Sequence, residues 1–270
     1  MNAFSLFTIR RRIVGSLEFS GFVGLAFIPI SLICLSCLPA NALAQTQLGS
    51  DIDGAVSLLA SDYSVALSTD GNRLAIGARN HDGNGSESGH TRVYHWSGAE
   101  WIQLGFDIDG EAAEDHSGVS VALSSDGNRL AVGASGNDDN GDNAGQVRVY
   151  QWSGTEWAQL GSDIDGEAAG DQSGVSVSLS ADGNRVAIGA PENDGTDSNA
   201  GHVRVYEWAG SAWTQLGADI DGEASWDTFG TSVSLSHDGN RLAAGAPMAD
   251  GNDLGSGQVG VYQWSGSDWV

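Results

Sequence analysis

A 56-residue repeat constrains the fold of this chain more than any other sequence feature. Gln-Leu-Gly begins at residues 47, 103, 159 and 215, and Asp-Gly-Asn-Arg begins at residues 70, 126, 182 and 238. Both motifs keep the same step, so no insertion interrupts the repeat. A fixed period of this length is typical of solenoids, propellers and arrays, in which each unit buries its apolar face against its neighbours.

Each repeat contains four short apolar runs separated by residues that form turns. In the third repeat the runs are 175–179, 186–190, 203–208 and 213–216. The first two alternate with period two around an Asp-Gly turn, and a polar stretch follows at 192–201. This pattern predicts four antiparallel strands per repeat, with a long loop between the second and the third.

The two faces of the predicted sheet differ in size. Val175, Val177 and Leu179 alternate with serines, and the second run places Ala187 and Gly189 together on a small face. Such a sheet can stack its bulky side on the small side of the next, as the blades of a propeller do. We therefore expect an all-β fold, a β-propeller of four 56-residue, four-stranded blades. The repeats run approximately over 48–103, 104–159, 160–215 and 216–270.

The ends of the repeat array bear on how many blades the ring holds. The last repeat ends at Trp269 and Val270, where its fourth strand begins, and residues 45–49 match the remainder of such a strand. One alternative is a ring closed by the N-terminal strand, which would leave no unpaired sheet edge. The other is a partial propeller that belongs to a larger ring.

The first 44 residues have the order of a secretory signal peptide. Three arginines at 10–12 precede a charge-free apolar run at about 22–38, and Ala42-Leu43-Ala44 supplies a small-residue cleavage site. We expect cleavage before Gln45, and a secreted or cell-surface protein with no membrane span after cleavage. An uncleaved membrane anchor is the alternative, because the apolar run approaches the length that spans a bilayer.

The charge of the chain excludes several classes of function. The formal net charge is −24, and the chain contains no lysine. Phosphates would be repelled, so we expect no nucleic-acid partner. Lysine-dependent Schiff-base and P-loop chemistry are excluded as well. A strongly acidic surface instead suits cations or basic partners.

Short motifs add a family resemblance. The fourth repeat has Phe229-Gly230 on its first strand and Gly245-Ala246-Pro247 at the end of its second. The third keeps Gly189-Ala190-Pro191, and the second and first keep Gly133-Ala134 and Gly77-Ala78. With the period and the strand order, these motifs resemble the FG-GAP repeat, the blade unit of the integrin alpha-chain propeller and of many bacterial secreted proteins. The resemblance implies an extracellular propeller, often calcium-binding and concerned with adhesion or recognition.

The calcium loop that the family carries between its first two strands is not matched. It has the pattern D-x-[DN]-x-D-G-x-x-D, whereas this connection holds only Asp126-Gly127-Asn128-Arg129 and its copies. One carboxylate followed by an arginine does not form a calcium cage. We favour a hairpin turn, with Asp and Gly in positions that need unusual dihedral angles.

The loops between the second and third strands are better calcium candidates. Their oxygen-bearing side chains stand at nearly alternate positions, so that a looping backbone could direct several oxygens at one ion. The alternative is a solvated loop rich in turn formers, which we also expect for the acidic set at 163–167. The predicted metal ligands are Asp82, Asn84, Asp138, Asn140, Asp142, Asp194, Asp197, Asp250, Asn252 and Asp253.

Each repeat also carries a tryptophan pair around a short hairpin loop. The pairs Trp152 with Trp157 and Trp208 with Trp213 are candidates for stacking on sugar rings. The alternative, which repetition in every unit favours, is a cross-strand clamp. The recurring arginines, among them Arg92, are expected to pair with nearby carboxylates, because an unpaired inward charge is costly.

We find little sign of catalysis in the sequence. The six histidines are expected to occupy different positions in their repeats, and none shows H-x-x-x-H spacing. We therefore expect a recognition or adhesion module without catalysis of its own, which binds calcium and an extracellular protein or glycan. One alternative is a carbohydrate-active enzyme, a glycosidase or lyase with carboxylates near the propeller axis. Another is a structural spacer in a surface assembly.

Overall fold

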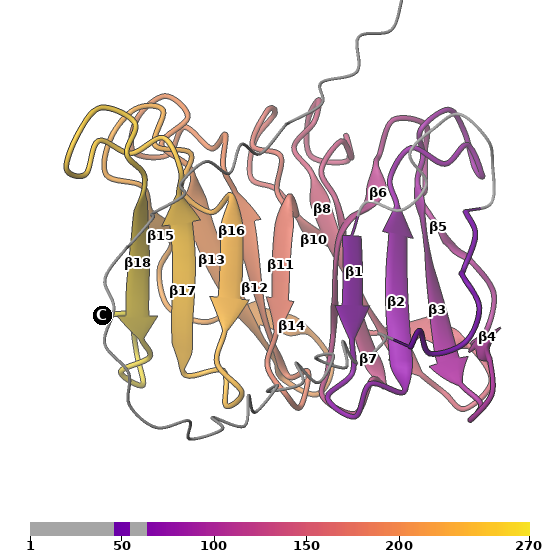
Figure 1. The fold of residues 1–270 in the computed structure, drawn as a ribbon. Helices are drawn as coiled ribbons and strands as arrows, with labels where there is room; N and C mark the ends of the chain where they lie inside the picture. The colour runs from indigo at the N-terminus through magenta and orange to yellow at the C-terminus, as the bar shows by residue number, and fades with distance from the viewer. Residues whose placement is uncertain (1–45, 55–63) are drawn as a thin grey trace, which may run out of the picture. The chain divides into compact units, whose positions relative to one another are not determined.

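The computed structural model describes residues 46–54 and 64–270, and this part contains strands and turns but no helix. The chain divides into Met1–Thr46 and Gln47–Val270, and every described strand belongs to the second unit (Figure 1). The predicted signal peptide lies outside the described residues. Within the described residues, no helix is long and apolar enough to cross a membrane.

The strands form four sheets in chain order. The first sheet contains β1 (Ser64–Leu67), β2 (Arg73–Ala78), β3 (His90–Trp96), β4 (Trp101–Gln103) and β5 (Ile108–Asp109). The second contains β6 (Ser117–Leu123), β7 (Arg129–Ala134), β8 (Gln146–Trp152), β9 (Trp157–Gln159) and β10 (Ile164–Asp165). The third contains β11 (Ser176–Leu179), β12 (Arg185–Ala190), β13 (His202–Trp208), β14 (Trp213–Gln215) and β15 (Ile220–Asp221). The fourth contains β16 (Ser232–Leu235), β17 (Arg241–Ala246) and β18 (Gln258–Gln263).

The predicted four-stranded antiparallel meander is confirmed in the first three sheets, with one addition, whereas the fourth sheet has three strands and an isolated bridge between Trp264 and Trp269. In each of the first three sheets a two-residue strand also pairs with the third strand, as Ile164 does with Val147. The reason is that the short fourth strand covers only the far half of the third. In the second sheet, β9 pairs with 150–152 and leaves 146–147 free to accept β10.

The connection between the first two strands is the hairpin turn that the sequence favoured. Oδ1 of Asp126 accepts hydrogen bonds from the Ser124 hydroxyl at 2.6 Å and from the Asn128 backbone N–H at 2.9 Å. Gly127 has a φ of 67°, a conformation that glycine adopts at little cost. The carboxylate therefore holds the turn, and the same bonds recur around Asp70, Asp182 and Asp238.

The core lies between neighbouring sheets, as the two unequal faces predicted. At the boundary of the second and third sheets, Ala131, Val147 and Val149 pack against Val186 and Ile188 of the next sheet. Corresponding clusters fill the other two boundaries. The first strands of neighbouring sheets also contact one another, β1 with β6, β6 with β11 and β11 with β16. This is the arrangement of stacked propeller blades.

Glycines allow the innermost strands to approach closely. A Cβ added at Gly189 would clash with the backbone carbonyl oxygen of Gly230 in the next sheet. Gly133 meets Gly174 in the same way, and the hydroxyl of Ser176 donates a hydrogen bond to that same Gly230 oxygen at 2.7 Å. The glycine of Gly-Ala-Pro and the glycine of Phe-Gly are therefore the contact points of adjacent blades. Gly189 lies near the end of the second strand of one blade, and Gly230 lies at the start of the next blade.

The tryptophan pairs tie the outer parts of the sheets together. Trp208 and Trp213 lie with ring centroids 5.4 Å apart, and Nε1 of Trp213 donates at 2.7 Å to the carbonyl of Leu160, which follows β9 of the preceding sheet. The other three pairs have the same geometry, with ring centroids 5.4 to 5.5 Å apart. These contacts give the pairs a structural role, and stacking on sugar by Trp152, Trp157, Trp208 and Trp213 stays a prediction.

Among the described residues, the first and the fourth sheets each have a neighbouring sheet on one side only. Val65 is 68% exposed and Val259 is 71% exposed, whereas their counterparts Val121 and Val147 are buried. The N-terminal segment contacts the first sheet, where Trp101 Nε1 donates to the Leu48 carbonyl at 3.1 Å. In the described part of the chain, no hydrogen bond joins residues 47–54 to β18. Ring closure and the number of blades in the ring stay predictions.

The glycine contact predicts a stability difference between two equivalent substitutions. Gly189→Ala should lower the free energy of unfolding by about 1–3 kcal/mol, because the added methyl forces the third and fourth sheets apart. Gly245→Ala is the matched control: its Cβ would meet the Ser232 side chain, as the Cβ at 189 meets Ser176, but no backbone of a following sheet. Denaturant unfolding of both variants measures the difference, and equal losses would contradict the close-contact argument.

Candidate functional site

The long loops that follow the second strand of each sheet lie at one end of the sheets, opposite the Asp-Gly hairpins (Figure 1). The first aspartate of each loop folds the loop onto itself. Asp138 accepts a hydrogen bond from the backbone N–H of Asn143 at 2.7 Å, and Asp194 accepts one from Asn199 at 2.7 Å. Asp82 and Asp250 accept the equivalent bonds from Glu87 and Gly255. These four predicted metal ligands therefore shape the loops.

Two of the predicted amide ligands join each loop to the segment that leads into the next sheet. Nδ2 of Asn140 donates to the carbonyls of Gly166 at 2.7 Å and of Glu167 at 3.3 Å. Asn84 makes the same two bonds to Gly110 and Glu111. Backbone bonds such as Gln172 N–H to Asn143 carbonyl continue this link. The loop end is therefore a connected surface, not a set of separate loops.

The remaining predicted ligands are exposed, and each makes a hydrogen bond within its own loop. Asp197 accepts from Ser198 N–H and Asp253 from Leu254 N–H, while Asp142 accepts from the Asn143 side chain. Asn252 uses its backbone N–H to bind Ser256. In the described residues, none of the seven predicted aspartate ligands belongs to a group of three His or carboxylate ligand atoms within 4.8 Å of one another. Calcium binding by these loops stays a prediction.

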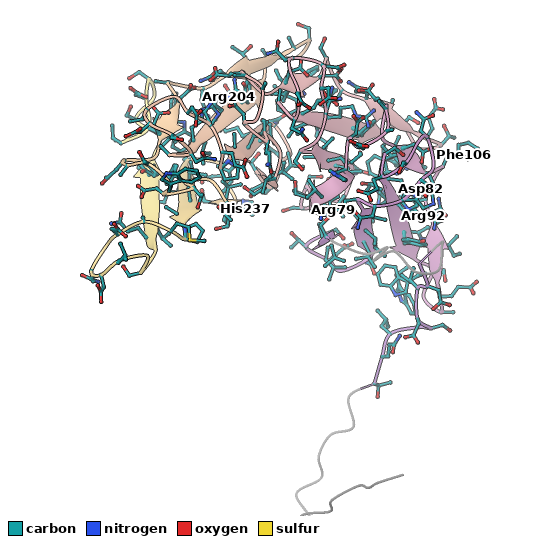
Figure 2. The ribbon with its side chains drawn as sticks, turned by 90° about the horizontal axis from the view of Figure 1, so that it is seen from above. Arg79, Asp82, Arg92, Phe106, Arg204 and His237 are labelled. Atoms are coloured by element: carbon teal, nitrogen blue, oxygen red, sulfur yellow. The ribbon has the colours of Figure 1, made fainter. Side chains whose placement is uncertain are left out.

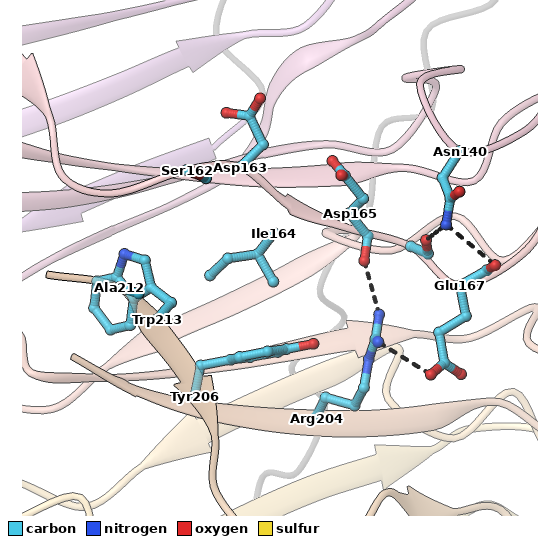
Figure 3. A pocket seen from close by; sticks show the side chains of 11 residues that line it. Asn140, Ser162, Asp163, Ile164, Asp165, Glu167, Arg204, Tyr206, Ala212 and Trp213 are labelled. Atoms are coloured by element: carbon cyan, nitrogen blue, oxygen red, sulfur yellow. Dashed lines mark hydrogen bonds and ion pairs between the residues drawn. The ribbon is translucent and has the colours of Figure 1, made fainter. Parts of the chain in front are cut away.

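A pocket of ≈ 330 Å³ opens between the second and third sheets beside this surface (Figure 3). One wall carries Asp163, Asp165 and Glu167, and the other carries Arg204, Tyr206 and Trp213. Burial raises the pKa of Asp165 above its usual range, although a hydrogen bond from Gln146 opposes the shift. The sequence predicted that this acidic set is solvated, but the stacking of the sheets turns it toward Arg204 of the next sheet.

Arg204 holds the two walls of the pocket together. Its Nη2 donates to the Asp165 carbonyl at 3.0 Å, and its Nη1 lies 3.2 Å from Oε1 of Glu167 (Figure 3). Arg148 binds Asp109 and Glu111 of the first sheet in the same way. The predicted pairing with carboxylates is confirmed for Arg148 and Arg204, and both pairs cross from one sheet to the next. In the other recurring series, Arg73, Arg129 and Arg241 instead donate to backbone carbonyl or side-chain amide oxygens.

Arg92 shows what happens when no described sheet precedes. It binds Asp107 of its own sheet through two hydrogen bonds of 2.9 and 2.7 Å. Arg92 and Arg204 occupy the same position in different repeats and lie in different sheets (Figure 2). In the third sheet, Asp219, the counterpart of Asp107, is therefore free of its arginine and faces His202 instead.

Three groups of His and carboxylate side chains bring their ligand atoms within 4.8 Å of one another in the described residues. They are His90 with Asp107 and Asp109, Glu111 with Asp139 and Asp163, and Glu167 with His202 and Asp219. The expectation that the histidines never share a repeat position is wrong, because His90 and His202 are separated by two full repeats. Comparing position 90 with 146, 202 and 258, which alternate His and Gln, would have found this.

His90 is held neutral by its surroundings. Its side chain is buried, and the centroid of its ring lies 3.9 Å from the centroid of the His81 ring. Its Nδ1 lies 3.9 Å from Oδ2 of Asp107. Burial, with smaller contributions from His81 and Arg92, lowers the pKa of His90 to about 4, although Asp107 opposes the shift. Since both oxygens of Asp107 already bind Arg92, this first group has its carboxylate charge compensated.

Comparison with known proteins identifies the repeat and the scaffold. Residues 108–150, from β5 to β8, match the FG-GAP repeat family. No curated protein sequence matches the chain. A periplasmic gluconolactonase from Pseudomonas aeruginosa is similar in structure, with a TM-score of 0.52 and 16% identity over 77% of this chain and 56% of that one. A Bacteroides uniformis protein with a provisional assignment as a 6-phosphogluconolactonase has a TM-score of 0.51 and 11% identity over 75% and 50%.

These similarities establish the fold and nothing about chemistry, because both identities are low. The chain spans about half the length of the two solved chains. The predicted β-propeller scaffold and the resemblance of the sequence to FG-GAP repeats are confirmed.

Burial of His90 predicts an acid-dependent loss of stability. The folded pKa of about 4 lies below the ordinary value of 6.5, so between these pH values the unfolded chain binds a proton that the folded chain does not. The free energy of unfolding should therefore fall as the pH falls from 6.5 to 4, with His90 contributing on the order of 3 kcal/mol. His90→Gln, which installs the residue found at 146 and 258, should flatten this part of the stability profile.

Denaturant unfolding at several pH values in the presence of a chelator measures the profile. His237→Gln, in the exposed hairpin between β16 and β17, is the control for the change of side-chain type. A variant at position 90 with the same pH slope as the parent chain would refute the prediction.

Proposed function

We propose that this chain, an FG-GAP repeat protein on a β-propeller scaffold, is a secreted or cell-surface recognition module that binds its partner through the loop end of the sheets. The observation that carries the proposal is the connected acidic surface built by the loops and the segments between sheets. Asn140 and its counterpart Asn84 fix each loop to the following repeat, so the surface is organised before a partner arrives. Preorganisation lowers the entropic cost of binding.

The partner that suits this surface carries positive charge. Two sets of carboxylates line the boundaries between sheets. At the boundary of the first and second sheets the set is Glu111, Asp139 and Asp163. At the boundary of the second and third sheets it is Asp163, Asp165 and Glu167. Arg148 and Arg204 compensate only part of this charge. A basic segment of an extracellular protein is therefore the favoured partner, and a glycan bound through a bridging cation is the other candidate.

An enzyme on the same scaffold is the alternative function. Two of the similar solved structures are described as a periplasmic gluconolactonase and a provisionally assigned 6-phosphogluconolactonase, so hydrolysis of a sugar lactone is the first reaction to test. Fold alone does not assign an activity. Repetition of the same carboxylate and arginine set at two boundaries favours binding, since a catalytic centre needs only one such set.

Substitutions at the two ends of the sheets test the recognition proposal. The double variant Glu111→Gln/Asp139→Asn removes two exposed charges from the loop end, and Glu100→Gln/Glu156→Gln removes two from the hairpin end. On arrays of basic peptides and of glycans, the loop variant should bind at least tenfold more weakly than the parent chain, with the hairpin variant within twofold. Equal losses in both variants, or turnover of a lactone or polysaccharide by the parent chain, would count against recognition as the function.

Calcium at the loops that follow the second strands is part of the same proposal. Added calcium should raise the melting temperature of the chelator-treated chain by several degrees, because an ion bound only by the folded state stabilises it. Calorimetric titration and a thermal melt measure this effect. If neither heat nor a thermal shift is observed at millimolar calcium, the metal part of the proposal fails while the loop surface remains testable.

A further inference from the structure

The side chains of Glu167, His202 and Asp219, which are far apart in the sequence, meet at the boundary of the second and third sheets. Glu167 lies in the segment after β10, His202 begins β13, and Asp219 precedes β15. Nδ1 of His202 lies 3.9 Å from Oε2 of Glu167 and 3.9 Å from Oδ2 of Asp219. One nitrogen and two carboxylate oxygens therefore point at a common space.

His202 has no hydrogen-bond partner in this place. Its side chain is 2% exposed, and its Nε2 is buried without a partner in the described residues. The two carboxylate oxygens at 3.9 Å are beyond hydrogen-bond range of Nδ1. A buried polar ring without partners is costly, which makes the arrangement unusual for a purely structural histidine. Burial lowers the pKa of His202 to about 4, so the imidazole is neutral near pH 7 and has a lone pair to offer.

The charges around the ring favour a cation. Asp165 lies beside Glu167 in the pocket, and Asp221 adds a further carboxylate near Asp219. Among the described residues, Arg204 is the one arginine that forms an ion pair with Glu167 or Asp219. Arg204 binds Oε1 of Glu167 and leaves Oε2 directed at His202. Gln215 likewise binds Oδ1 of Asp219 and leaves Oδ2 free. Each carboxylate is thus oriented through one oxygen while the other faces the imidazole.

Among the described residues, this combination of a histidine with two free carboxylate oxygens occurs around His202 only. The second repeat has Gln146 in place of the histidine, and its amide contacts Asp139 and Asp165. The first repeat has His90, but Asp107 is bound by Arg92, and position 55 holds alanine where the glutamate would stand. The fourth repeat has Gln258. The histidine and both free carboxylate oxygens therefore coincide only around His202.

We propose that Glu167, His202 and Asp219 form a binding site for one divalent transition-metal ion, with Zn²⁺ as the representative ion. Imidazole with two carboxylates is a donor set that suits zinc and its neighbours in the first transition series better than calcium, which takes oxygen ligands alone. Three protein ligands leave at least one coordination position for water or a ligand atom. Glu167 is 46% exposed and Asp219 is 30% exposed, so this position is open to solvent.

The geometry needs a small contraction to hold the ion. Metal–ligand bonds of about 2.1 Å in a tetrahedral site place ligand atoms ~3.4 Å apart, about half an ångström closer than the 3.9 Å separations here. The partly exposed side chains of Glu167 and Asp219 can supply this movement without a change in the buried histidine. The site shares Glu167 with the proposed recognition surface, but its other two ligands, His202 and Asp219, are not part of that surface, so the two proposals can be tested separately.

Zinc titration of the full chain after chelator treatment tests the site. We expect one Zn²⁺ per chain by calorimetry, and a Co²⁺-loaded chain should show the visible absorption of a nitrogen–oxygen ligand set. His202→Gln, which installs the residue of positions 146 and 258, should weaken Zn²⁺ binding at least tenfold. Glu167→Gln, at a partly exposed position where the amide oxygen can still accept from Arg204, should weaken it by a similar factor and keeps the test valid if the histidine variant is unstable.

His90→Gln is the matched control, because it removes a buried histidine of the same repeat position and should leave Zn²⁺ binding within twofold of the parent chain. Unchanged zinc binding in both the His202 and the Glu167 variants would overturn the proposal. A loss of equal size in His90→Gln would overturn it as well. Failure of the zinc site and failure of the recognition proposal are distinguishable, because Glu111→Gln/Asp139→Asn should leave zinc binding intact.

Discussion

The close approach of glycine backbones between adjacent sheets sets the spacing on which the rest of the structure depends. Gly189 faces the carbonyl of Gly230, and Ser176 donates a hydrogen bond to the same oxygen. The contact fixes how near the innermost strands lie, because any side chain at position 189 would separate them. Further out, the sheets diverge and the gap is filled by valine and isoleucine, then by the tryptophan that binds the Leu160 carbonyl. A narrow inner contact and a wide outer one together give a wedge-shaped blade.

The same spacing decides which polar groups meet. With the inner strands in contact, Arg204 reaches across the boundary to Asp165 and Glu167 of the preceding sheet. Where no described sheet precedes, Arg92 turns to Asp107 within its own sheet. One sequence position therefore has two partners, chosen by the presence of a neighbour. The partner of each arginine therefore depends on whether another sheet is stacked against its own, and the arginines do not form a site by themselves.

Much of the fold was predictable because it depends on short-range chemistry repeated at a fixed interval. The turn at Asp126 follows from Asp-Gly chemistry, and the strands follow from alternation over four to seven residues. The two-residue strand β10 was not predictable, because two residues carry no periodicity. The grouping of Glu167 with His202 could not be predicted either, since these residues are far apart in the sequence and meet only through sheet stacking. Alignment of the repeats gives one signal, the alternation of His and Gln at a buried position.

That alternation is also the strongest argument that the boundary around His202 has a role beyond packing. Gln146 satisfies its amide with Asp139 and Asp165, so glutamine is a complete structural solution at this position. His202 fills the same place in the fold but leaves its ring without a hydrogen bond and two carboxylate oxygens without a donor. Replacing a hydrogen-bonded glutamine with an unpartnered histidine at this position therefore brings no gain in stability. The imidazole lone pair, directed between two carboxylates, is what the exchange adds, and a cation is the partner that uses all three.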